Sequence, residues 1–247
     1  MITPMSSEQG SAPSEVLDEI AVSDDMTHHE RGKQPLYRYR YSRVQSFHPP
    51  GLAAVFDQSG AFHIRTDGCP AYSTRFLQSF GFYEGLAAVE VLEGWTHVTP
   101  TGAPAYDDRY SWVGNFQEGR CVTARRDGRF SHIDRFGTPA YPQTFRYLGD
   151  FRYGAAVATL DNGMLTHIRK DGSRLHIKEF EDLDVFHKGF ARAKDSKGWF
   201  HVDRSGTELY PSRYESVEPF YNGRARVRIA ASSYGLVNEA GVLVVRL

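Results

Sequence analysis

Short apolar runs and glycine-containing turns alternate along the chain from about residue 35 onward. Residues 85–91 read Gly-Leu-Ala-Ala-Val-Glu-Val, and residues 95–98 read Trp-Thr-His-Val after a Glu-Gly pair. Runs of this length and composition, separated by glycine turns, predict β-hairpins. We expect a short third strand over 103–106, where Pro104 suits an edge position, and a possible fourth strand over 109–116.

The same pattern recurs with a period of 34 or 35 residues. A glycine preceded three residues earlier by phenylalanine occurs at Gly85, Gly119, Gly154, Gly189 and Gly223, and Gly51 ends a looser copy. A second glycine keeps the same phase at Gly68, Gly102, Gly137, Gly172, Gly206 and Gly241. The sequence therefore predicts six tandem units whose short strands share a core only when the units stack.

Polar and aromatic residues also recur in register. Histidine stands five residues before the second glycine in five units, at His63, His97, His132, His167 and His201, and the sixth unit has Leu236. Four residues after that glycine the chain has Tyr72, Tyr106, Tyr141, His176 and Tyr210.

The unit resembles the bacterial WG repeat, in which a glycine and tryptophan precede an Ile-Asp-x-x-Gly turn and a Pro-Tyr stretch. Residues 128–137 and 198–206 carry the resemblance best. The tryptophan position holds Ala61, Trp95, Phe130, Leu165, Trp199 and Tyr234, so the chain looks like a divergent branch of the WG repeat family. The resemblance implies a repeat module and no specific chemistry.

These observations predict an all-β fold, with six units of three to four short strands over 34–247. The units form either an open β-repeat array or a six-bladed, propeller-like ring. Residues 37–47 match the back half of a unit, which the last unit lacks. In a ring they would complete that last unit, whereas a linear stack that starts in another phase explains the same match.

Residues 1–33 are rich in Ser, Glu, Asp and Met and have almost no aromatic residues. Such a segment buries too little apolar surface to offset the entropy of ordering, so we predict a disordered tail. A short amphipathic helix over 14–22 is the alternative. His28, His29 and Glu30 are then expected to be exposed.

Charge and composition exclude several classes of function. The 247 residues carry a formal net charge of -1, which does not favour nucleic acid as a partner. No apolar run approaches the length of a membrane span and no signal peptide is evident, so we expect a cytoplasmic protein without a membrane partner. Cys69 and Cys121 occupy non-equivalent places in their units, which predicts neither a disulfide nor a cysteine metal site.

The in-register histidines allow two interpretations. Imidazoles on one line could bind a metal or small ligand, which makes His63, His97, His132, His167 and His201 speculative binding residues. Alternatively, a residue that recurs in every unit helps to build every unit, with its nitrogens hydrogen-bonded to neighbouring strands.

A carboxylate-rich stretch supplies the other candidates, Glu181, Asp182 and Asp184. Paired acids could do general acid–base work, but other junctions between units lack them and no nucleophile, phosphate-loop or zinc-protease motif occurs. We therefore predict a non-enzymatic scaffold without a cofactor that binds another protein or serves a neighbouring enzyme. A ligand- or metal-binding module and a cryptic hydrolase or lyase are the alternative hypotheses.

Overall fold

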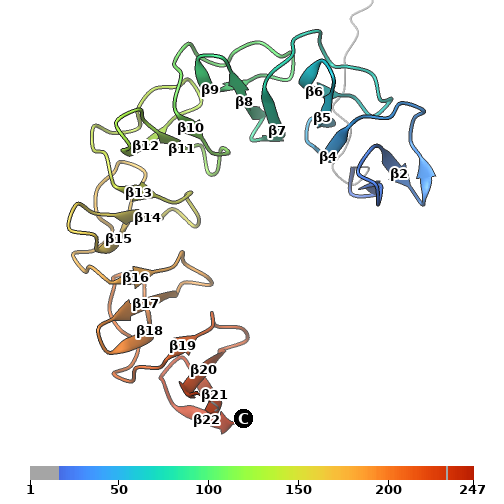
Figure 1. Ribbon diagram of the computed structural model, residues 1–247. Helices are drawn as coiled ribbons and strands as arrows, with labels where there is room; N and C mark the ends of the chain where they lie inside the picture. The colour runs from blue at the N-terminus through green and yellow to red at the C-terminus, as the bar shows by residue number, and fades with distance from the viewer. Residues whose placement is uncertain (1–16, 232) are drawn as a thin grey trace, which may run out of the picture. The chain divides into compact units, whose positions relative to one another are not determined.

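The computed structural model describes residues 17–231 and 233–247, and every regular element within them is a β-strand (Figure 1). This confirms the predicted all-β tandem array. The chain divides into two compact bodies. The first contains the described residues up to Phe116 together with Arg135–Gly137, and the second contains Gln117–Asp134 and Thr138–Leu247.

The first body contains three antiparallel sheets of three strands each. In chain order, their strands are β1 (Ile20–Val22), β2 (His29–Arg31), β3 (Gln34–Pro35), β4 (Arg43–His48), β5 (Leu52–Asp57), β6 (Gly60–Ile64), β7 (Gln78–Tyr83), β8 (Leu86–Val91) and β9 (Gly94–Val98). The strand β10 (Trp112–Val113) follows.

The second body begins with the hairpin of β11 (Cys121–Ala124) and β12 (Phe130–Ile133). Two three-stranded sheets come next, made of β13 (Tyr147–Leu148), β14 (Ala156–Thr159) and β15 (Leu165–Ile168), and of β16 (Asp182–Leu183), β17 (Ala191–Asp195) and β18 (Gly198–Val202). The last sheet has four strands, β19 (Ser216–Val217), β20 (Arg224–Ala230), β21 (Ser233–Asn238) and β22 (Leu243–Arg246).

The hairpin of β8 and β9 shows why the repeated residues fold as they do. Ala87 and Ala88 are buried, and their small side chains leave room for the aromatic rings of the core. The turn before β8 places Glu84 and Gly85 at positive φ, the geometry of a tight two-residue hairpin. At the other end of the hairpin Gly94 has φ +129°, and a Cβ there would lie 2.5 Å from the Tyr110 carbonyl oxygen.

Two of the predicted strands of this unit are confirmed, and the third is wrong. Runs 85–91 and 95–98 become β8 and β9. The stretch 103–106 forms only a single bridge, between Val98 and Pro104, and the equivalent segments with Arg174 and Glu208 in place of the proline also form a single bridge. The possible fourth strand is reduced to one bridge between Trp95 and Tyr110 and the two residues of β10.

Consecutive repeats stack through a tyrosine ring placed on a glycine turn. A Cβ added to Gly102, which has φ +79°, would lie 2.7 Å from the ring of Tyr72 in the preceding repeat. Only glycine meets both the conformational and the steric requirement. The same contact recurs at Tyr37–Gly68, Tyr106–Gly137, Tyr141–Gly172, His176–Gly206 and Tyr210–Gly241.

The structure corrects the prediction for the N-terminal segment. The sheet of β1, β2 and β3 begins inside the stretch predicted to be a disordered tail, and Ile20–Val22 is a strand where a helix was the alternative. Leu17 and Ile20 are buried in one apolar cluster with Tyr37 and Tyr41. The array therefore gains a seventh hairpin, β1–β2, and the rest of the predicted tail, residues 1–16, lies outside the described residues.

Residues 37–47 do not complete the last unit. Their strand β4 pairs with β5 of the repeat that follows, from Arg43↔Phe56 to His48↔Leu52. The last sheet takes its fourth strand, β22, from its own repeat. The strand exchange proposed for a ring is therefore wrong, and residues 37–47 match the back half of a unit because they begin the sheet of β4, β5 and β6.

Candidate functional site

Each in-register histidine is enclosed within its own repeat. His97 is fully buried; its Nδ1 lies 2.6 Å from the Tyr106 hydroxyl and its Nε2 lies 3.0 Å from the Gly114 carbonyl oxygen. Its ring packs against Phe116 at a centroid distance of 4.8 Å. One side chain thus joins three segments of the repeat.

The same arrangement occurs at the other four predicted histidines. In each of them Nε2 lies 2.7–3.1 Å from a carbonyl oxygen seventeen residues ahead, and the ring packs against a phenylalanine at 4.1–4.6 Å. The Nδ1 partner is a tyrosine hydroxyl except in the fourth repeat, where it is His176. These residues are His63, His132, His167 and His201.

These partners determine the tautomer of the histidines. A carbonyl oxygen only accepts, so Nε2 carries the proton and donates it, and Nδ1 then accepts from the tyrosine hydroxyl. Burial disfavours the imidazolium and lowers the pKa of His63, His97, His132, His167 and His201 to about 4. At neutral pH each imidazole is neutral and uses both nitrogens.

A metal ion at these histidines would have to displace a carbonyl or tyrosine partner. Within the described residues, no three His, Cys, Asp or Glu side chains come together as a metal site. The contacts of both ring nitrogens and the phenylalanine packing give each of these histidines a role in holding its repeat together.

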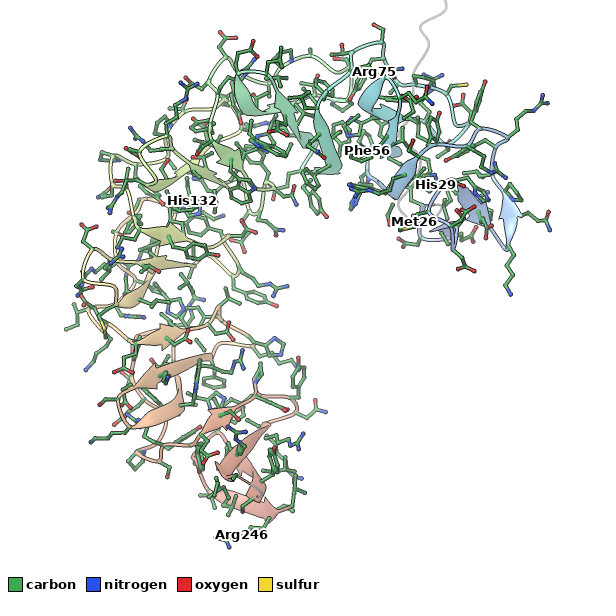
Figure 2. All side chains as sticks on the ribbon, in the orientation of Figure 1. Met26, His29, Phe56, Arg75, His132 and Arg246 are labelled. Atoms are coloured by element: carbon green, nitrogen blue, oxygen red, sulfur yellow. The ribbon has the colours of Figure 1, made fainter. Side chains whose placement is uncertain are left out.

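The expected exposure of His28 and His29 is wrong. His29 is fully buried in β2, where Figure 2 marks it, and it repeats the pattern of the other histidines. Its Nδ1 lies 2.6 Å from the Tyr37 hydroxyl, its Nε2 lies 2.8 Å from the Gln45 carbonyl oxygen, and its ring packs on Phe47 at 4.3 Å. His28 is buried beside it, with Nε2 3.3 Å from a Glu30 carboxylate oxygen.

The three acidic candidates have separate partners. The Asp184 carboxylate pairs with the guanidinium of Arg192, which also donates to the Val217 carbonyl oxygen at 3.2 Å. Asp182 is exposed on β16 opposite Lys194 of β17. Glu181 is exposed, and its amide donates to the Lys194 carbonyl oxygen at 2.9 Å. Asp184 thus serves as an ion-pair partner that ties β16 to β17.

The recurring Arg-aromatic pairs also have a structural role. The Nη1 of Arg75 donates to the carbonyl oxygens of Tyr72, Ser73 and Thr74, and its guanidinium stacks on Phe62 at 3.6 Å. Arg213 holds its own turn in the same way and stacks on Phe200 at 3.6 Å. Each guanidinium thus closes the turn that leads from one repeat to the next.

Sequence reasoning missed a groove lined by residues that depart from the repeat. It has a volume of about 520 Å³ and lies between the hairpin tips 58–60 and 91–93, with residues 75–77 along its wall. Leu77 and Leu92 line it, and Leu92 is 87% exposed. We call this surface the Leu77–Leu92 groove.

The two leucines are exceptional for their positions. The residues at the place of Leu77 in later repeats are Ser111, Arg146, Glu181 and Glu215. Those at the place of Leu92 are Gln58, Arg126, Asp161 and Ser196 in four other repeats, and an alanine in the last repeat. Two leucines at places where the other repeats have small, polar or charged residues were visible in the aligned sequence, and they are the signal that could have located the groove.

Comparison with known proteins supports the fold and leaves the site open. The family described as WG containing repeat matches residues 199–230, which confirms the resemblance on those residues. No curated protein matches the chain. No helix in the described part of the chain is long and apolar enough to cross a membrane.

Among solved structures, BamB from Moraxella catarrhalis is similar to this chain with a TM-score of 0.50 and 15% identity, over 94% of this chain and 85% of BamB. The WD40 beta propeller domain of Doa1 aligns with a TM-score of 0.39 and 13% identity, over 88% of each chain. The likeness to BamB concerns the fold alone.

Proposed function

We propose that this protein is a non-enzymatic repeat scaffold that binds another protein through the Leu77–Leu92 groove. The observation that carries the proposal is the pair of exposed leucines at positions where no other repeat has a large apolar side chain. Residues shared by all repeats build the array, so a specific function falls to residues that differ between repeats.

The walls of the groove are preorganised. Arg75 is held by Ser59, by three carbonyl oxygens and by the ring of Phe62. The backbone of Leu77 is anchored to β8, because its amide donates to the Glu90 carbonyl oxygen at 2.9 Å. A rigid apolar surface loses little entropy when a partner binds, and fixed anchors of this kind contribute strongly to protein interfaces.

The proposal is tested by native mass spectrometry of the protein purified gently from its own host. We expect a stoichiometric polypeptide partner that disappears in the double variant Leu77→Ser, Leu92→Arg, which installs the residues found at these places in the next repeat. Both positions are exposed, so the fold should tolerate the change.

A matched control is Ile177→Ser, because Ile177 is also 87% exposed and lies outside the groove. It should retain the partner. Equal loss in the control, or retention in the double variant, would contradict a role for the groove.

A further inference from the structure

Arg75 in the Leu77–Leu92 groove differs from the equivalent arginine four repeats later. Arg213 forms ion pairs with Asp195 at 2.9 Å and with Glu208 at 2.6 Å. Arg75 contacts the Ser59 hydroxyl, backbone carbonyl oxygens and an aromatic ring, all of them neutral. Among the described residues Arg75 has no carboxylate within ion-pair distance.

Part of this difference lies in the third segment of the repeat; the other part is that Asp57, at the place of Asp195, accepts from Ser59 instead of pairing with Arg75. Glu208, which neutralises Arg213, stands two residues after the second glycine of its repeat and forms a bridge with Val202. Pro70 occupies the same place in the repeat of Arg75, where it forms the equivalent bridge with Ile64. Proline has no side-chain acceptor, so Arg75 lacks the direct carboxylate contact that Glu208 gives Arg213, and the Asp57 carboxylate reaches it only through the Ser59 hydroxyl.

From this geometry we infer that the groove recognises a polypeptide segment in which an aspartate or glutamate stands next to aliphatic residues. The carboxylate of that segment pairs with the Arg75 guanidinium, and its aliphatic side chains pack on Leu77 and Leu92. Arginine presents several donors in a fixed plane, which suits a carboxylate well. This inference rests on the proposed function and specifies the chemistry of the partner.

The charged and polar groups around the groove favour a single acidic contact flanked by apolar ones. Glu93 lies at the tip of the neighbouring hairpin and places a carboxylate on that side of the groove. Gln58 and Ser59 form the opposite tip, where the amide and hydroxyl of Ser59 donate to the Asp57 carboxylate. A uniformly acidic surface therefore fits less well than one carboxylate beside aliphatic side chains.

The test uses three synthetic peptides of equal length and the full chain with isotope-labelled leucine methyl groups. The first peptide alternates aspartate with leucine, the second replaces aspartate by asparagine, and the third replaces leucine by serine. We expect the first peptide to shift the methyl signals of Leu77 and Leu92. The other two should bind about tenfold more weakly, since each loses one class of contact.

The decisive variant is Pro70→Glu, which supplies Arg75 with the counter-ion that Glu208 gives Arg213. It should keep the fold and weaken the first peptide about tenfold, while binding of the asparagine peptide stays unchanged. Equal binding of the aspartate and asparagine peptides, or no effect of Pro70→Glu, would overturn the inference.

The two proposals fail in different ways. If the double leucine variant loses a natural partner that Pro70→Glu retains, the scaffold function is supported and the inference of an acidic ligand is contradicted. If the double leucine variant retains the partner, the groove is not the binding site and both proposals are contradicted.

Discussion

Lowering the pH from 7 to 5 should strongly destabilise this protein through its buried histidines. Burial lowers the pKa of His63, His97, His132, His167 and His201 from the ordinary 6.5 to about 4. Only the folded chain disfavours the charged form, so the unfolded chain binds more protons between pH 6.5 and 4. The stabilisation is therefore complete above pH 6.5 and is lost as the pH falls through this window.

The size of the effect follows from the pKa values. A base whose pKa falls from 6.5 to 4 costs about 2 kcal/mol of folding free energy at pH 5. Five such groups together cost about 9 kcal/mol between pH 7 and 5, comparable to the whole stability of a typical domain. The effect is large because one repeat places the same buried base in successive hairpins.

The assay is urea unfolding followed by tryptophan fluorescence at pH 7, 6 and 5. The slope of the free energy of unfolding against pH, near pH 5, should correspond to the uptake of about four protons on unfolding. The variant His97→Gln should be less stable at pH 7 and should take up about one proton fewer. A free energy of unfolding that is the same at pH 7 and pH 5 would refute the assignment of these imidazoles as neutral and buried.

Three further changes test the packing between repeats. Gly102→Ala should cost about 2 kcal/mol more than Gly85→Ala in urea unfolding, because both glycines have φ near +80° but only Gly102 faces a ring. His176→Tyr should raise the melting temperature, since a tyrosine hydroxyl is the usual donor to the buried histidine. The neutral His176 imidazole has one N–H for two acceptors, the His167 Nδ1 and the Lys178 carbonyl oxygen. Arg213→Lys should destabilise by about 1–3 kcal/mol, because lysine lacks the planar fork that serves carbonyl oxygens and carboxylates together. No loss in the first or third variant, or a lower melting temperature in the second, would contradict the corresponding contact.

Much of the fold could be predicted from the sequence because its determinants are local and repeated. Glycines at positive φ mark the turns, and the apolar runs between them are the paired strands β8 and β9. The length of the third segment could not be predicted from composition. It depends on where arginines such as Arg75 cap the preceding carbonyl oxygens, which is a three-dimensional property.

The seventh hairpin was missed because its turn departs from the pattern. His29 lies eight residues before Tyr37, whereas the other histidines precede their partner by nine. Lys33, with φ 64°, stands four residues before Tyr37, at the place where later repeats have glycine. A search based on glycine spacing therefore begins one repeat too late, although the series His29, Tyr37 and Phe47 nearly preserves the spacing of later repeats.

The candidate site was predicted only in part. Sequence register identified His63, His97, His132, His167 and His201 as one class, and the building role was one of the two interpretations given. Deciding between them required the partners of both ring nitrogens. The two leucines of the Leu77–Leu92 groove stand out in the aligned repeats, but whether they line one groove depends on how the neighbouring hairpin tips lie.

The central claim is that the histidine line builds the repeats and leaves binding to the residues that vary. Nitrogen–proton correlation spectra of the imidazole side chains at pH 7, recorded before and after addition of zinc and then of a chelator, test it most directly. The account predicts neutral rings protonated at Nε2 for His63, His97, His132 and His201, with signals that neither addition changes. Imidazolium signals, protonation at Nδ1, or shifts that follow zinc and reverse with the chelator would contradict it.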